Sequence, residues 1–178
     1  RRHKLFGRCC IGLVTMMALK AEGVSEVYVV DIVASRLKKA EELGASGVID
    51  SSVEDLMQRL NEPTKGQGID LAVETSGSNA AAQQCIEVVK KGSVIVYVGY
   101  GKSGMMTLPM SLALDKELTF KTVFRYRHIY PLAIKAVEEG RVTLKGIVID
   151  VFPLDDLQRA LDLSVSDKQR IVKAVVKI

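Results

Sequence analysis

Two kinds of apolar segment alternate along the chain, and together they predict strands that alternate with helices. Short runs rich in β-branched residues and bounded by turn residues are typical of buried strands, and they lie at 27–30, 47–50, 69–74 and 93–98. Longer segments with apolar residues near helical spacing stand between them, at 13–21, 35–43, 51–60 and 78–90. This alternation is typical of a parallel sheet with right-handed crossovers. We therefore expect an α/β fold of the Rossmann type, with a doubly wound parallel sheet.

Breaker and capping residues predict where several of these elements begin and end. Ser35 is expected to cap the second helix, because its hydroxyl can accept a hydrogen bond from an amide of the first turn. Gly23 and Gly44 follow helical segments and are expected to end them. The segment 62–68 is expected to be a loop, because it holds one proline and two glycines.

A glycine-containing turn precedes the first helix. Gly7, Cys9 and Gly12 occupy the three glycine positions of the dinucleotide-binding pattern G-x-G-x-x-G. A helix N-terminus offers unpaired N–H groups to a pyrophosphate, and glycine lets the backbone approach it closely. Cys9 breaks the pattern at the second position, where a side chain points toward the phosphates. A nucleotide-free unit of the same fold therefore remains the alternative.

An acidic residue closes the strand after this helix. Asp31 follows Gly12 by 19 residues, near the roughly 20-residue spacing of a ribose-binding acid. Its carboxylate can accept hydrogen bonds from the adenosine ribose and would repel a 2′-phosphate, which favours NAD over NADP. Arg36 is nearby in the sequence, and an arginine is one way to hold that phosphate. NADP therefore stays the second possibility.

Composition and charge exclude several other classes. The chain has 178 residues, of which 48% are hydrophobic, and this is enough for a sizeable core. Its net charge of +4 is mild, and no basic run interleaves with aromatic residues, which disfavours nucleic-acid binding. No apolar run is long enough to span a membrane. The three cysteines form no CxxC pair and only two histidines accompany them, so neither a disulfide framework nor a structural zinc site is expected. A cytoplasmic location is expected.

The first residues do not fit the pattern of the rest. The strand before the glycine turn should be the central strand of the sheet and hence apolar, but it is Arg1-Arg2-His3-Lys4-Leu5-Phe6. A fragment, an altered reading frame at the start, or an uncertain sequence there would each explain the change, and these three explanations stay open.

Several short motifs follow one another in a fixed order. They are Gly12-Leu13-Val14, Val30-Asp31, Ala34-Ser35-Arg36-Leu37, Leu43-Gly44-Ala45, Glu74-Thr75-Ser76-Gly77, Val98-Gly99 and Val123-Phe124-Arg125-Tyr126. Together they resemble the cofactor-binding half of the zinc-dependent medium-chain dehydrogenases, and within that family the sorbitol (polyol) dehydrogenases. The resemblance covers residues 11–178, and the VFRY motif is its most specific part. Arg8-Cys9 departs from the family pattern, which usually has Ala-Gly there.

The resemblance implies a role for each residue that matches a family motif. It implies cofactor contacts for Gly7, Cys9, Ile11, Gly12, Asp31, Arg36, Thr75, Ser76, Val98, Gly99, Tyr100, Phe124 and Arg125. Within this set it places Ile11 beside the pyrophosphate, Thr75 and Ser76 toward the adenine, and residues 98–100 at the nicotinamide ribose. It also implies that Arg125 and Tyr126 reach toward the polyol or its bound water.

Each of these residues also has a structural alternative. Thr75 and Ser76 could be loop hydroxyls that bond their own backbone, Phe124 could be a core residue, and Arg125 a solvated surface charge. His128, in a basic run, is expected to be structural rather than catalytic.

The resemblance also implies what this chain would lack. In the family, zinc and the proton relay come from an N-terminal barrel domain, and no paired Cys and His at ligand spacing occur here. The expected function is therefore the NAD-binding portion of a polyol or secondary-alcohol dehydrogenase, with no catalytic or metal-binding residue in the chain itself. The alternative is a non-catalytic dinucleotide-binding or interaction module.

The C-terminal segment is expected to be a short β-α-β extension of the main domain. Residues 1–140 would be the NAD-binding domain, and residues 141–178 would return to the barrel domain. Strands at 146–152 and 170–178 would flank a helix at 154–163, and the last strand would lack a neighbour. The resemblance further implies a homo-oligomer, a dimer or tetramer, in which 105–109 and 118–123 pair between subunits.

Overall fold

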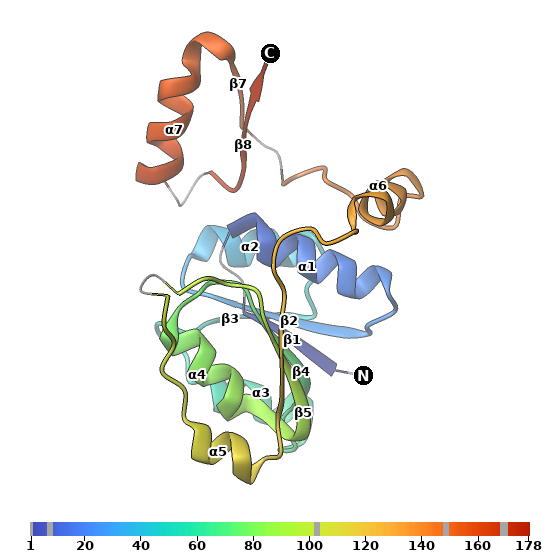
Figure 1. Ribbon diagram of the computed structural model, residues 1–178, viewed down its shortest axis with the longest axis vertical. Helices are drawn as coiled ribbons and strands as arrows, with labels where there is room; N and C mark the ends of the chain where they lie inside the picture. Colours follow the sequence, from blue (N-terminus) through green and yellow to red (C-terminus); the bar gives the residue numbers. More distant parts are fainter. Residues whose placement is uncertain (1, 7–8, 102–103, 148–149, 168–170) are drawn as a thin grey trace.

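The computed structural model describes residues 2–6, 9–101, 104–147, 150–167 and 171–178, with residues 2–6 and 9 described in backbone only. Its main sheet is parallel and has the strand order β3-β2-β1-β4-β5-β6 (Figure 1). The strands are β1 (Arg2–Phe6), β2 (Glu26–Asp31), β3 (Gly47–Asp50), β4 (Ile69–Glu74), β5 (Val89–Tyr97) and β6 (Thr119–Thr122). This order is that of a doubly wound Rossmann sheet, so the predicted fold class is confirmed. The polar segment at the start of the chain does form the central strand, between β2 and β4.

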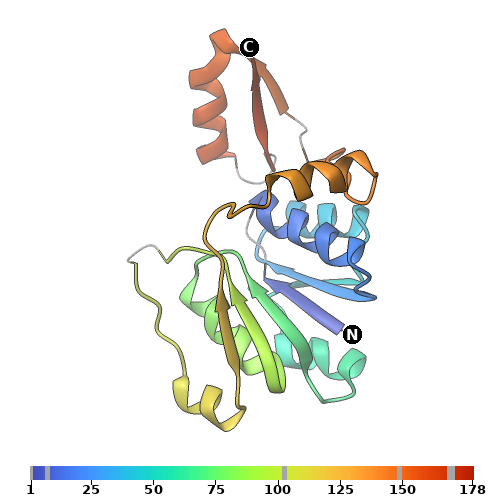
Figure 2. The ribbon, with the colours of Figure 1, turned by 45° about the vertical axis from the view of Figure 1, so that its right-hand side comes forward.

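Helices cover both faces of the sheet (Figures 1 and 2). On one face lie α1 (Cys9–Ala21) and α2 (Ala34–Glu42). The other face is covered by α3 (Leu56–Thr64) and α4 (Asn79–Val88), with α5 (Met110–Asp115) beside α4. Neighbouring side chains of β2 are therefore buried on opposite faces. Val29 packs among core residues on the α1 face, and Val30 packs among core residues on the α3 and α4 face. A strand buried on both faces cannot alternate apolar and polar residues, which explains its continuous apolar run.

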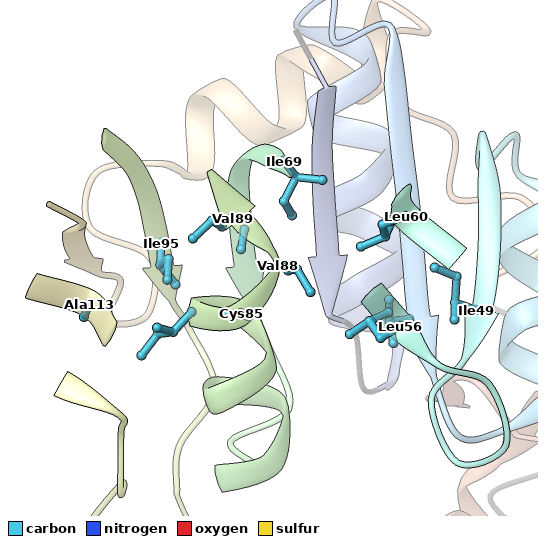
Figure 3. Packing of buried hydrophobic residues seen from close by; sticks show 12 residues of the cluster. Ile49, Leu56, Leu60, Ile69, Cys85, Val88, Val89, Ile95 and Ala113 are labelled. Atoms are coloured by element: carbon cyan, nitrogen blue, oxygen red, sulfur yellow. The ribbon is translucent and has the colours of Figure 1, made fainter. Parts of the chain in front are cut away.

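Each face of the sheet has its own hydrophobic core. The core of the α3 and α4 face is drawn in Figure 3 and includes Ile49, Leu60, Ile69, Ile86 and Ile95. The opposite core contains Leu13, Met16, Val27, Leu37 and Ala40. The two cores thus pack the sheet against the helices of both faces.

The boundaries of helices α2 and α3 differ from the prediction. Helix α2 begins at Ala34 after an N-cap at Val33, so Ser35 does not cap it. Helix α3 begins at Leu56, because the side chain of Asp55 accepts a hydrogen bond from the amide of Gln58 at 2.9 Å. It then continues to Thr64 with a proline in its last turn, so the predicted loop at 62–68 was wrong over its first three residues.

Strand β5 begins four residues earlier than predicted. Val89 pairs with Ile69, and the register then shifts before Val94 pairs with Leu71. The irregular pairing leaves residues 90–92 exposed. The helix predicted at 78–90 ends at Val88 instead.

The C-terminal residues form a separate β-α-β unit, as predicted. Strands β7 (Asp150–Pro153) and β8 (Ala174–Lys177) form a two-stranded parallel sheet that carries α7 (Leu157–Ser166), after the short 3₁₀ turn η1 (Leu154–Asp156). The prediction that the last strand lacks a neighbour was wrong, because β8 pairs with β7.

The segment that leads to this unit packs against the main body. Helix α6 (Tyr130–Glu138) follows β6 and lies near α1 (Figure 2). An ion pair of 3.2 Å joins Arg141 to Glu22, just beyond the end of α1. Val142, Ile147 and Val172 are buried in the core of the α1 face. Among the described residues, no helix has the length and apolar character needed to cross a membrane.

Candidate functional site

A pocket of about 700 Å³ opens at the carboxyl edge of the main sheet. Its described lining consists of Ile11, Thr75, Val98, Gly99, Tyr100, Val123, Phe124, Arg125 and Tyr126. These residues come from the start of α1 and from the segments that follow β4, β5 and β6. In an open α/β sheet this edge is where ligands bind, at the point where the winding of the chain reverses.

Eight of the nine lining residues are residues for which the family resemblance implied a cofactor or substrate contact. Val123 is the ninth, and its signal was its place in the VFRY motif. The described lining contains no carboxylate, imidazole or thiol. The described lining instead offers aromatic rings, backbone groups, the hydroxyls of Thr75, Tyr100 and Tyr126, and the guanidinium of Arg125.

The turns after β4 and β5 form one wall of the pocket, and they pack backbone against backbone. A Cβ added to Gly77, which has a φ of +69°, would lie 1.9 Å from the carbonyl oxygen of Tyr100. A Cβ added to Gly99 would lie 2.1 Å from the amide nitrogen of Gly77. Real Cβ atoms do not approach other atoms so closely, so both positions require glycine.

Asp31 and Arg36 form a second polar group at the same edge of the sheet. Asp31 is 7% exposed, and its Oδ1 accepts hydrogen bonds from the amides of Ile32 at 2.7 Å and Val33 at 3.1 Å. Its Oδ2 lies 3.8 Å from a guanidinium nitrogen of Arg36. The Nε of Arg36 is buried and has no hydrogen-bond partner in the described structure. A buried donor without an acceptor is costly. Neither Asp31 nor Arg36 is among the described residues that line the pocket.

The segment after β6 presents its aromatic side chains to the pocket. Phe124 is 62% exposed, which contradicts the alternative that it is a core residue. Its ring lies 6.3 Å from that of Tyr100, and the guanidinium of Arg125 lies 5.1 Å from its centroid. Arg125 has a φ of +50°, a conformation that non-glycine residues seldom adopt.

Ser76 and Thr75 differ in where the structure places them. Thr75 lines the pocket, whereas Ser76 does not. The hydroxyl of Ser76 donates to Glu74 and accepts from the amide of Ser78 at 3.0 Å. The hydroxyl is therefore used within its own turn, as the structural alternative for this residue supposed.

The glycine turn is only partly described. Gly7 lies outside the described residues, and for Cys9 only the backbone is described, at the start of α1. Gly12 is buried within α1, while Ile11 is 48% exposed and reaches the pocket.

A second hollow adjoins the larger pocket, whereas His128 lies outside both. A smaller hollow of about 390 Å³ shares five of its residues and adds Tyr97, Gly101, Gly104, Met106 and Thr122. His128 is exposed, has a φ of +53°, and lines neither hollow. Across the part of the chain that the structure describes, no three His, Cys, Asp or Glu side chains gather as a metal site would require.

Sequence comparisons show which known proteins this chain resembles. The zinc-binding dehydrogenase family matches residues 10–139. An uncharacterised zinc-type alcohol dehydrogenase-like protein of Escherichia coli is 38% identical over 98% of this chain and 50% of its own length. Human sorbitol dehydrogenase is 36% identical over 90% of this chain and 46% of its own length. The chain thus spans about half the length of these relatives.

A solved structure agrees with the sequence comparisons. The crystal structure of 2R,3R-butanediol dehydrogenase from Bacillus subtilis superimposes with a TM-score of 0.89 and 30% identity, over 99% of this chain and 50% of that one. This chain therefore again matches about half of the longer protein. The chain therefore belongs to the zinc-binding dehydrogenase family, in which sorbitol dehydrogenases are among its relatives.

Proposed function

We propose that this chain is the NAD(H)-binding portion of a zinc-type dehydrogenase that oxidises a polyol or another secondary alcohol. The pocket at the carboxyl edge of the sheet carries the proposal, because it gathers residues from α1 and from the segments after β4, β5 and β6 into one hollow. Relatives named for sorbitol and for 2R,3R-butanediol support the substrate class.

The polar groups of the described site fit a dinucleotide. Arg36 offers a buried Nε donor that lacks an acceptor, and Asp31 offers a carboxylate beside it. The hydroxyls of an adenosine ribose can donate hydrogen bonds to this carboxylate. The negative charge of Asp31 would also repel a 2′-phosphate, which supports NAD over NADP.

In the complete enzyme, bound nicotinamide supplies the acceptor for the hydride of the alcohol. The residues of this chain bind and orient. Val98, Gly99 and Tyr100 would hold the nicotinamide ribose, while Phe124 covers the nicotinamide end. Arg125 and Tyr126 would direct the substrate hydroxyl. Zinc is proposed to be held by another part of the complete enzyme, where it would polarise that hydroxyl.

Calorimetric titration of the purified chain with NADH tests the cofactor site. Binding is expected, and Asp31→Ala is expected to weaken it by about tenfold or more, since about 1.4 kcal/mol of lost interaction corresponds to that factor. The variant Cys9→Gly restores the glycine pattern and serves as the comparison for the turn. Absence of NADH binding by both the original chain and Cys9→Gly would overturn the proposal.

A second experiment separates an enzyme portion from a non-catalytic binding module. The chain is joined to the half that its full-length relatives possess, and NAD reduction is followed with sorbitol, with and without a zinc chelator. Zinc-dependent turnover is expected. Tight NADH binding without turnover by a folded, zinc-loaded fusion would instead favour the binding module.

The same proposal includes a homo-oligomer, with no nucleic acid or membrane as partner. Strand β6 is an edge of the main sheet, and Met105, Met110 and Leu114 in the segment that precedes it are exposed. An exposed strand edge with apolar neighbours is suited to pairing with a second copy. Light scattering coupled to gel filtration would give twice or four times the mass of one chain, and a monomer at all concentrations would contradict this part.

A further inference from the structure

Glu74 is a buried acidic residue for which the pocket has no direct use. It is the last residue of β4 and is 0% exposed. Its Oε1 accepts hydrogen bonds from the amides of Ser76 at 2.7 Å and Gly77 at 3.1 Å, and from the Ser76 hydroxyl. Its Oε2 accepts from the Gly77 amide at 3.0 Å. A carboxylate is costly to bury unless it is well hydrogen-bonded, and here all these donors belong to the turn that follows β4.

The same residue also holds the turn that follows β5. Its carbonyl oxygen accepts hydrogen bonds from the amides of Val98 at 2.8 Å and Gly99 at 3.1 Å. A Cβ at Gly99 would lie 2.7 Å from Oε2 of Glu74. The side chain of Glu74 therefore fixes one turn, its backbone fixes the other, and Gly99 packs against the carboxylate.

These two turns contribute Thr75, Val98, Gly99 and Tyr100 to the pocket wall. We infer that Glu74 is a positioning residue for the cofactor: by its hydrogen bonds it sets the separation of the two turns, and so the shape of the wall against which the dinucleotide lies. This inference rests on the proposed NAD(H) site. Glu74 itself does not line the pocket, so it acts through its neighbours.

The variant Glu74→Gln tests the inference with almost no change in volume. An amide offers one oxygen and one NH₂ group, so at least one of the converging donors loses its acceptor. We expect NADH binding, measured by calorimetry, to weaken by about tenfold or more. The matched control is Ser93→Ala, because the buried hydroxyl of Ser93 bonds the Ile69 carbonyl at 3.1 Å and joins the same two strands at their other end.

A general loss of stability would affect both variants, whereas loss of positioning affects only one. Ser93→Ala is expected to stay within about twofold of the original affinity. If Glu74→Gln also stays within that range, or if both variants weaken equally, the inference is overturned. If the original chain does not bind NADH at all, the proposed function is overturned. If the original chain binds NADH and Glu74→Gln binds it equally well, only the inference about Glu74 is overturned.

A double-variant cycle shows whether Ser76 acts through Glu74. Ser76→Ala removes one donor from the carboxylate and is expected to weaken NADH binding by a few-fold. If Ser76 contacts the cofactor directly, its effect adds to that of Glu74→Gln; if it acts through the carboxylate, the double variant is no weaker than Glu74→Gln alone. Additive effects would contradict the inference.

Amide hydrogen exchange gives a measurement that needs no ligand. The variant Ser76→Ala keeps Glu74, so it can be used even if Glu74→Gln does not fold. In this variant the amides of Gly77 and Gly99 are both expected to exchange faster than in the original chain. Faster exchange confined to the turn after β4, with the Gly99 amide unchanged, would show that the two turns are not coupled and would overturn the inference.

Discussion

The proposed preference for NAD over NADP depends on the pairing of Asp31 with Arg36. The carboxylate and the guanidinium are 3.8 Å apart and both are largely buried. If Asp31 becomes Ser, the repulsion of a 2′-phosphate disappears and Arg36 no longer has its carboxylate partner. The ratio of NADPH to NADH affinity is then expected to rise by about tenfold or more.

Calorimetry with both nucleotides on Asp31→Ser measures this change in preference. The control is the double variant Asp31→Ser with Arg36→Gln, which should lose the gain in NADPH binding. A gain that persists without the arginine would show that the guanidinium does not hold the phosphate.

Tyr97 makes stability depend on pH at the alkaline end. Its ring packs edge-on against Phe120 at 5.8 Å between centroids, and burial raises the pKa of its phenol above the ordinary value of 10.0. Above about pH 10 the phenol ionises in the unfolded chain but stays protonated in the folded one, so the folded state binds more protons and loses stability as pH rises. Because the ring is partly exposed, the slope should be well below about 1.4 kcal/mol per pH unit.

Urea unfolding near pH 9 and near pH 11 tests this dependence. Tyr97→Phe is expected to lose less stability between the two conditions than the original chain. Tyr126→Phe is the control, because Tyr126 is 61% exposed and should leave the difference unchanged. An equal loss in Tyr97→Phe and the original chain would contradict the prediction.

Single residues also show what the sequence could reveal about the site. The placement of Asp31 at the end of one predicted strand and of Gly99 directly after another could be predicted from the strand pattern, because parallel strands end at one edge. Thr75 and Val98 were assigned roles only through the family resemblance. Phe124, Arg125 and Tyr126 follow an edge strand in irregular backbone, so no periodicity marks them and only the family motif did. The packing of Gly77 on Tyr100 needs coordinates, because it joins two turns distant in sequence.

Among the elements, helix α4 has an unusual C-terminal cap. The Nζ of Lys116 donates to the carbonyls of Ile86 at 3.0 Å, Glu87 at 2.7 Å and Val89 at 2.9 Å. A cation at a helix C-terminus satisfies carbonyls that have no partner within the helix. Lys116→Met keeps the apolar stem and removes the donors, and is expected to lower the free energy of unfolding by about 1–2 kcal/mol.

Urea denaturation of Lys116→Met measures that loss. Lys38→Met, on the exposed side of α2, is the control and should change stability by no more than about 0.5 kcal/mol. Equal effects of the two substitutions would contradict a capping role for Lys116.

Element boundaries were harder to predict than element types. Residues 51–55 contain two serines and an aspartate that could each begin a helix, and only the contact from Asp55 to Gln58 decides between them. The early start of β5 depends on the pairing of Val89 with Ile69. Local sequence carries no information about such a tertiary contact.

At the scale of the whole molecule, the C-terminal unit is joined to the main body by a few buried side chains. Val172 lies in the α1 core and is 7% exposed, whereas Val151 on β7 is 61% exposed. Val172→Asp would bury an unpaired carboxylate and is expected to lower the free energy of unfolding by about 3 kcal/mol. Val151→Asp should change it by no more than about 0.5 kcal/mol.

Urea unfolding followed by both circular dichroism and NADH binding tests this coupling. If the two parts unfold together, Val172→Asp shifts both transitions by the same amount. A shift in the circular dichroism transition alone would show that the C-terminal unit unfolds on its own.

The strand order also governs how quickly the binding site can appear during folding. Strand β1 has β2 on one side and β4 on the other, and Phe6 pairs with both Val30 and Glu74. The pairing of β1 with β2 closes a short loop of chain. The pairing of β1 with β4 closes a longer loop that contains β2, β3 and three helices, and such long-range parallel pairing is slow. NADH capture during refolding should therefore lag behind the recovery of helical signal, so a nascent chain would possess most of its secondary structure before it could recognise a nucleotide.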